Sequence, residues 1–189
     1  MAHFFIISAP SGAGKTTIVE RTIAQLQPNY AIKRVVTYTT RAPRAKEVHG
    51  VDYYFVSKEI FDGMIAAQLF MEWASVYGHY YGTPVTALQE VEQGVSGIAI
   101  LDVQGAQAIR ARYPHVYAIA LLPPDAAELE NRLRVRATEP ESQMQTRLAA
   151  VKQESVLLSD PQLFTHRITP GTLETMTEQL VSLIAQLLV

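Results

Sequence analysis

A glycine-rich loop stands near the start of the chain, between an apolar run and a segment with helical periodicity. Residues 9–16 read APSGAGKT and directly follow FFIIS at residues 4–8. The loop fits the end of the phosphate-binding pattern G-x-x-x-x-G-K-[ST], with Ala9 at the place of the first glycine. Alanine is tolerated there if it keeps a negative φ. The pattern predicts a buried strand, a loop and a helix, in that order, at the start of the chain.

This loop indicates a nucleotide site. Its glycines let backbone N–H groups turn towards phosphate oxygens, and the following helix directs its positive end at them. Lys15 would reach the β- and γ-phosphates, while the Thr16 hydroxyl would ligate Mg²⁺. The alternative, a glycine-rich turn with a surface lysine, does not explain the strand and helix that flank the loop. The residues expected to contact ATP are Ala9, Pro10, Ser11, Gly12, Ala13, Gly14, Lys15, Thr16 and Thr17.

Apolar runs and helical segments alternate along the rest of the chain. Strands are expected at residues 4–7, 31–37, 53–56, 97–101 and 116–122, and helices at residues 16–26, 57–68 and 173–188. Thr83-Pro84 predicts the start of another helix, which Gly94 would end. Pro123-Pro124-Asp125 would open one more. The expected fold class is therefore α/β, a P-loop NTPase-type parallel sheet core with helices on both faces.

Composition narrows the classes of partner. The 189 residues favour one domain that can carry small inserted subdomains, and the formal net charge of −2 gives no support for nucleic acid or acidic membranes as partners. The chain has no cysteine, which excludes disulfides and fits the cytoplasm. No stretch approaches the ~18 apolar residues that cross a bilayer. Whether the protein is a monomer or a homo-oligomer is left open.

A basic loop and an isolated acid indicate an acceptor site. Arg41 and Arg44 lie three apart in TTRAPRAKEVHGVDYYFV, residues 39–56, and could grip one phosphate dianion with Tyr53 as an added donor. The alternative is a solvated basic loop. Glu72 lies within LFMEWA, where a carboxylate is costly to bury unless a donor faces it; guanine offers two donors on one edge and adenine does not. The alternative places Glu72 on the exposed face of a half-buried strand.

Together these segments resemble guanylate kinase. Residues 39–56 satisfy the family signature T-[ST]-R-x-x-[KR]-x-x-[DE]-x-x-G-x-x-Y-x-[FY]-hydrophobic at every defined position. The resemblance continues through FMEWA, through YYGT, through D-x-Q-G at residues 102–105, and through RLRVR…QTRL at residues 132–148. It therefore spans nearly the whole chain.

The resemblance implies ATP and GMP as small-molecule substrates, with Mg²⁺. It implies a core at about residues 1–35, 84–125 and 150–189, a GMP-binding insert at about 36–83 and a lid at about 126–149. Lys15 and the lid arginines would act on the transferred phosphoryl group, and Asp102 would join Thr16 at the metal. The implied catalytic residues are Lys15, Arg132, Arg136 and Arg147. The implied GMP-binding residues are Thr37, Arg41, Arg44, Tyr53, Glu72, Tyr81, Thr83 and Asp102.

The chain departs from the family pattern at four places. Ile100 stands where many members carry a second acid two residues before Asp102. Val135 and Ala137 replace common lid glycines, and Pro170 stands near an expected asparagine close to adenine. These departures bear on base choice, lid motion and adenine contacts.

Two other functions remain as alternatives. One is a related P-loop kinase with another acceptor, such as ribose 1,5-bisphosphate, which would need neither Glu72 nor the whole signature at residues 39–56. The other is a non-catalytic binding module of the same fold. Such modules typically lack a working phosphate loop, whereas Lys15 and Thr16 are present here.

Overall fold

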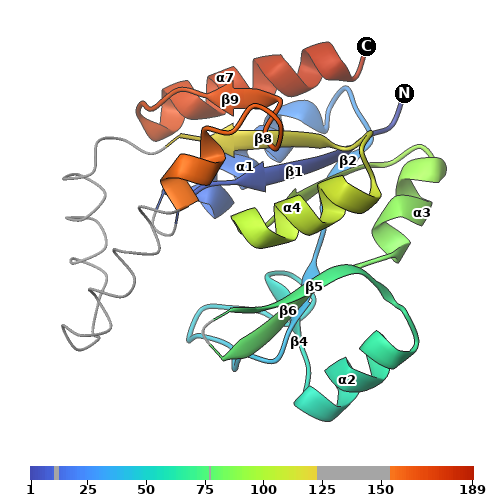
Figure 1. Cartoon of the computed structure of the whole chain (residues 1–189). Helices are drawn as coiled ribbons and strands as arrows, with labels where there is room; N and C mark the ends of the chain where they lie inside the picture. The colour runs from blue at the N-terminus through green and yellow to red at the C-terminus, as the bar shows by residue number, and fades with distance from the viewer. Residues whose placement is uncertain (11–12, 77, 123–153) are drawn as a thin grey trace.

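The structure is a computed structural model that describes residues 1–10, 13–76, 78–122 and 154–189. Within these residues the strands form two separate sheets (Figure 1). No helix in the described part of the chain is long and apolar enough to cross a membrane.

The larger sheet is parallel and carries the nucleotide loop. Its described strands stand in the order β2 (Ile32–Arg34), β7 (Ser96–Ile100), β1 (Phe4–Ser8), β8 (Tyr117–Leu121) and β9 (His166–Ile168). Each described pair of neighbours in this sheet runs parallel. All of β1 is buried, as expected of a central strand covered on both faces. The predicted α/β class with a parallel sheet core is confirmed.

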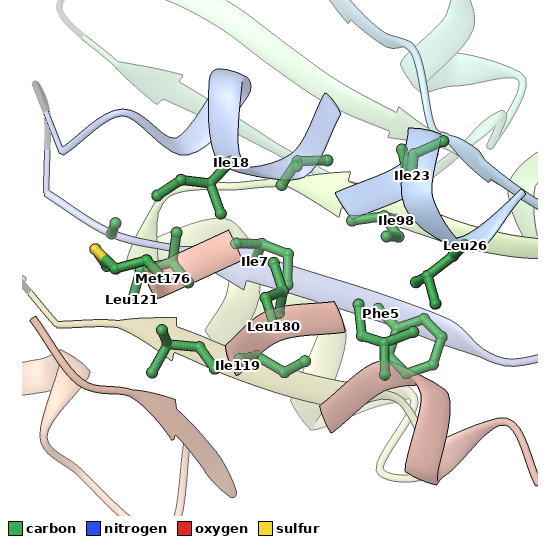
Figure 2. Packing of buried hydrophobic residues seen from close by; sticks show 14 of the residues in the cluster. Phe5, Ile7, Ile18, Ile23, Leu26, Ile98, Ile119, Leu121, Met176 and Leu180 are labelled. Carbon is green, nitrogen blue, oxygen red and sulfur yellow. The ribbon is translucent and has the colours of Figure 1, made fainter. Parts of the chain in front are cut away.

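Alternation along β1 divides the core into two layers. Phe5 and Ile7 face α1 (Lys15–Leu26) and α7 (Leu173–Leu187), as Figure 2 shows from close by. Phe4 and Ile6 pack on the opposite side with buried residues of α3 (Thr86–Glu92) and α4 (Val103–Arg112). Helices therefore cover both faces of the main sheet. Strand β1, before the phosphate loop, and helix α1, after it, are both packed into the core.

The smaller sheet lies within residues 37–84. Its described strands are β4 (Tyr53–Phe55), β3 (Thr37–Thr39), β6 (His79–Pro84) and β5 (Phe70–Val76), in that order. Helix α2 (Lys58–Ala66) packs on it through Phe61, whose ring stacks on Phe70 with 4.6 Å between centroids. Ser57 caps α2, as expected, because its hydroxyl accepts a hydrogen bond from the Ile60 amide at 3.3 Å. In Figure 1 this sheet lies below the main one.

Two expectations from the sequence were wrong. The segment at residues 31–37 is not one strand, because the chain leaves the main sheet at Val35, whose amide donates to Ile98, and joins the smaller sheet at Thr37. Thr83-Pro84 ends β6 and does not begin a helix; α3 begins at Thr86 and has no side-chain cap. Thr83 instead stays in β6, where it pairs with Glu72 of β5 and donates its hydroxyl to Glu72 Oε1.

Candidate active site

A cavity of about 260 Å³ opens at the carboxyl ends of β1 and β7, between the main sheet and the smaller one. Ligands of open parallel sheets bind at this edge. Polar residues from the two halves line the cavity. These are Lys15, Asp102 and Glu154 on the side of the main sheet, and Thr37, Arg41, Arg44, Tyr53, Glu72 and Tyr81 on the side of the smaller one.

The phosphate loop is shaped by Gly14, which caps α1 with a φ of +80°. That left-handed conformation favours glycine, and a side chain there would also meet Leu173 at 3.0 Å. Lys15 Nζ donates to the carbonyl oxygens of Ala9 at 2.6 Å and Pro10 at 3.0 Å. The lysine therefore folds back over the loop where phosphates are expected. Burial lowers the pKa of Lys15 to about 8, although Glu154 and Asp102 favour its charged form.

The loop at residues 40–47, which carries Arg41 and Arg44 and is called the arginine loop below, is organised by Glu47. Arg41 Nη2 donates to Glu47 Oε1 at 2.8 Å, and the Arg44 amide donates to Glu47 Oε2 at 2.8 Å. Burial opposes ionisation of Glu47, but these bonds outweigh it and lower the pKa of its carboxyl group. The Arg41 side chain is 14% exposed and the Arg44 side chain 71%. One arginine is therefore held in place, and the other is open to an incoming anion.

Tyr53 and Tyr81 complete the wall beside Arg41. The Arg41 guanidinium carbon lies 5.6 Å from the centre of the Tyr53 ring, and the Tyr53 and Tyr81 ring centres are 6.0 Å apart. Burial raises the pKa of Tyr53, and Tyr81 adds to the effect. The Tyr53 hydroxyl therefore stays protonated at neutral pH and can donate a hydrogen bond.

Glu72 lines the cavity from β5. It pairs with Thr83 across the sheet, and the Thr83 hydroxyl, which is fully buried, donates to Glu72 Oε1 at 2.6 Å. Burial raises the pKa of Glu72 to about 7; the bond from Thr83 works against this rise and the charge of Asp102 adds to it. The neighbouring Trp73 is 45% exposed, as strand alternation requires. Glu72 therefore faces inward, contrary to the alternative of an exposed strand face.

The first turn of α4 brings a second carboxylate close to Glu72. Asp102 is the N-cap of α4, and its Oδ1 accepts from the Gly105 amide at 2.7 Å. A Cβ atom at Gly105 would lie 3.4 Å from Glu72 Oε2 and 3.3 Å from Asp102 Oδ1. Gly105 is thus the spacer that allows both carboxylates to share this edge. Ile100, at the end of β7, lines the same cavity with an apolar side chain.

The donor set fits a magnesium ion that is held mainly by nucleotide phosphates. Thr16 is exposed in the first turn of α1, and Asp102 lines the cavity with a carboxylate. In the described parts of the chain, no group of three or more His, Cys, Asp or Glu residues could hold a metal by itself. Mg²⁺ in kinases is commonly bound through one or two protein oxygens together with phosphates and water, which is what these residues could provide.

The structure thus brings together two groups of predicted residues that are distant in sequence. Thr83 lies behind the cavity wall and reaches it through Glu72. Pro10, Ala13, Gly14, Thr16 and Thr17 lie in the phosphate loop or the first turn of α1. The predicted residues Ser11, Gly12, Arg132, Arg136 and Arg147 lie outside the described residues, as do Val135 and Ala137.

Sequence reasoning assigned no role to Glu154. The sequence holds one weak signal: Glu154 stands four residues before the apolar Leu158, so both side chains would lie on one face of a helix. Only the packing of that helix shows which way this face points.

A phosphate loop at the edge of a parallel sheet, across a cavity from two arginines in the loop after β3, defines a P-loop phosphotransferase architecture with a donor side and an acceptor side. A family model for guanylate kinase matches residues 1–187. The chain belongs to the guanylate kinase family.

Similar proteins agree with this assignment. A guanylate kinase of Thermosynechococcus vestitus is 47% identical over 153 residues, which cover 80% of this chain and 78% of that protein. A guanylate kinase of Escherichia coli (strain K12) is 42% identical over 151 residues, 79% of this chain and 72% of that protein. A crystal structure of guanylate kinase from Anaplasma phagocytophilum superposes with a TM-score of 0.75 at 26% identity, covering 100% of this chain and 87% of that one.

Proposed function

We propose that this protein transfers the γ-phosphoryl group of ATP to GMP, giving ADP and GDP. The observation that carries the proposal is that Glu72, held from behind by the Thr83 hydroxyl, faces the same cavity as Arg41 and Lys15. An ionised carboxylate can accept from both donors on the guanine edge, while the arginine loop offers donors for a phosphate. The cavity is therefore suited to a guanine nucleotide on one side and to a phosphate donor on the other.

The acceptor would be fixed at both ends. Arg41, kept in place by Glu47, would bind the GMP phosphate together with Arg44, Tyr53 and Tyr81. Glu72 would bind the guanine base, with Thr37 and Asp102 beside it and Thr83 holding its carboxylate. Fixing both ends places the acceptor phosphate in line with the donor, which is the main task of the protein in phosphoryl transfer.

The donor phosphates would lie over the loop from Ala9 to Thr17. Lys15 would exchange its bonds to the Ala9 and Pro10 carbonyls for bonds to phosphate oxygens. Thr16 and Asp102 would hold Mg²⁺, which supplies charge neutralisation at the β- and γ-phosphates. No general base is required, because the acceptor phosphate is already an anionic nucleophile.

The proposal extends to segments outside the described residues. We assign Arg132, Arg136 and Arg147 to the transferred phosphoryl group, within a lid at about residues 126–149. The smaller sheet and α2 would make up the GMP-binding insert at about residues 36–83. The rest of the chain would form the core. These assignments rest on the family resemblance and on the positions of the described elements.

A coupled assay for ADP release tests the proposal. The purified protein is given ATP, Mg²⁺ and one acceptor at a time from GMP, AMP, UMP and ribose 1,5-bisphosphate. We expect turnover with GMP and a far lower rate with the other three acceptors. Turnover only with ribose 1,5-bisphosphate would favour the alternative kinase, and no turnover with any acceptor would favour a binding module.

A further inference from the structure

Glu154 brings a third carboxylate to the cavity, on the side of the phosphate loop. Residues 154–158 are helical, and Leu158 at the end of this turn is fully buried in the core together with Phe164 (orange segment in Figure 1). Val156 and Leu157 are exposed. Because residues four apart share one face of a helix, the packing of Leu158 turns Glu154 inward. It lines the same cavity as Lys15 and Asp102.

The position of Glu154 is costly unless a positive charge lies near it. A carboxylate withdrawn from water needs a compensating charge or donor. Burial raises the pKa of Glu154, Lys15 works against the rise and Asp102 adds to it. Among the described residues, Lys15 is thus a positive group that favours ionised Glu154, and Glu154 in turn favours charged Lys15.

The two carboxylates near Lys15 are held differently. Asp102 is fixed to the start of α4 by its bond from the Gly105 amide, and it belongs to the proposed metal site. Glu154 comes from a separate helix that is anchored by Leu158. The carbonyls of Ala9 and Pro10 that accept from Lys15 carry no net charge. Glu154 therefore reaches the cavity from a different element than Asp102 does, and it is not taken up by the proposed metal site.

We propose that Glu154 is a positioning residue for Lys15, which holds the ammonium group over the phosphate loop in readiness for the donor phosphates. This rests on the proposed function. A carboxylate would repel the phosphates themselves, so Glu154 acts through the lysine and does not touch the nucleotide. Its effect should appear on the donor side and in turnover, and should leave GMP binding unchanged.

The test compares Glu154→Gln, Glu154→Asp and wild type. Turnover of ATP with GMP gives kcat, and isothermal titration gives separate dissociation constants for ADP and for GMP. Glu154→Gln keeps the size of the side chain and should lower kcat about tenfold and weaken ADP binding about threefold, as expected for loss of one partly screened charge. GMP affinity should stay within about twofold of wild type. Glu154→Asp, which keeps the charge, should recover much of the loss.

Other outcomes overturn the proposal. Equal weakening of ADP and GMP would mean that Glu154 supports the fold, and tighter ADP binding would mean that it merely repels phosphate. Unchanged kcat and ADP binding would remove it from the site. The matched control is Glu174→Gln on α7, an exposed carboxylate that pairs with Arg21, which should change none of these values. If wild type does not turn over GMP, the proposed function fails, and the ADP and GMP titrations still decide the role of Glu154.

Discussion

Replacing Glu72 by glutamine keeps the shape of the side chain and changes the group that would face guanine. The Thr83 hydroxyl can still donate to the remaining carbonyl oxygen, as it now does to Glu72 Oε1 at 2.6 Å. The other position becomes an NH₂ group, which presents a donor to the donors of the base. The substitution therefore removes the charged acceptor and sets like groups against each other.

The size of the effect follows from two terms. Truncating one partner of a buried, charged hydrogen bond costs about 2–4 kcal/mol, which is about 30- to 900-fold in kcat/KM. Burial raises the pKa of Glu72 to about 7, so at pH 7 only about half of the wild type carries the charge. The expected loss of kcat/KM is therefore about twofold smaller at pH 7, whereas at pH 8, where most of the wild type is ionised, nearly the full loss is expected.

The assay measures kcat/KM for GMP, IMP and AMP in both proteins at pH 8. The loss should be greatest for GMP, smaller for IMP, which lacks the amine, and absent for AMP. Because ionised Glu72 is destabilising in its buried position, the melting temperature of the apo variant at pH 8 should not fall below that of wild type. An equal loss on GMP and AMP would refute the reasoning, because Glu72 would then support the strand and another group would discriminate the base.

Three further predictions follow from the same contacts. GMP should bind more tightly as pH rises through 7, because Glu72 must lose its proton to accept from guanine. Isothermal titration of Glu72→Gln over the same pH range is the control: the GMP phosphate titrates equally with both proteins, so only the change caused by Glu72 should be missing from the variant. Lys15→Ala should reduce kcat by at least about a hundredfold with an unchanged circular dichroism spectrum; a loss of only a few-fold would remove Lys15 from its role. Arg41→Lys should weaken GMP binding about tenfold although the charge is kept, because lysine cannot reproduce the planar group that bonds to Glu47 at 2.8 Å; unchanged affinity would make Arg41 a surface charge.

Local sequence signals predicted the donor side of the fold well. The β1–α1 unit depends on an apolar run, a glycine that must take a positive φ and a helix start, all within residues 4–26. These requirements are met by neighbouring residues, so the sequence shows them directly. Glu72 was noticeable as an acid in an apolar context, but the sequence left an exposed strand face as an equal alternative, and only the structure shows that Glu72 faces the cavity.

The errors arose where distant parts of the chain decide the structure. Residues 31–37 are β-prone throughout, and only the pairing of Val35 with Ile98 and of Thr37 with Tyr53 divides them between two sheets. Thr83-Pro84 has the composition of a helix start, but both residues pair with β5, Thr83 with Glu72 and Pro84 with Phe70. Both outcomes depend on tertiary partners that local propensity does not contain.

Glu154 was missed for a related reason. A glutamate in a short helical turn is usually solvated, and its sequence neighbourhood gives no sign of the cavity. The burial of Leu158 four residues later sets the orientation of the turn. Its role therefore became visible only from the packing of the core.

The measurement that tests the account most directly offers all the acceptors at once. The protein is mixed with ATP, Mg²⁺ and equal concentrations of GMP, AMP, UMP and ribose 1,5-bisphosphate, and the phosphorylated products are separated by chromatography before the ATP is consumed. The cavity with Glu72 at one end and the arginine loop at the other predicts GDP as the dominant product. Because ADP is also the co-product of every transfer from ATP, phosphorylation of AMP is followed as loss of AMP. Loss of AMP, or formation of UDP or of a triply phosphorylated ribose, at a rate comparable with that of GDP formation would contradict the account.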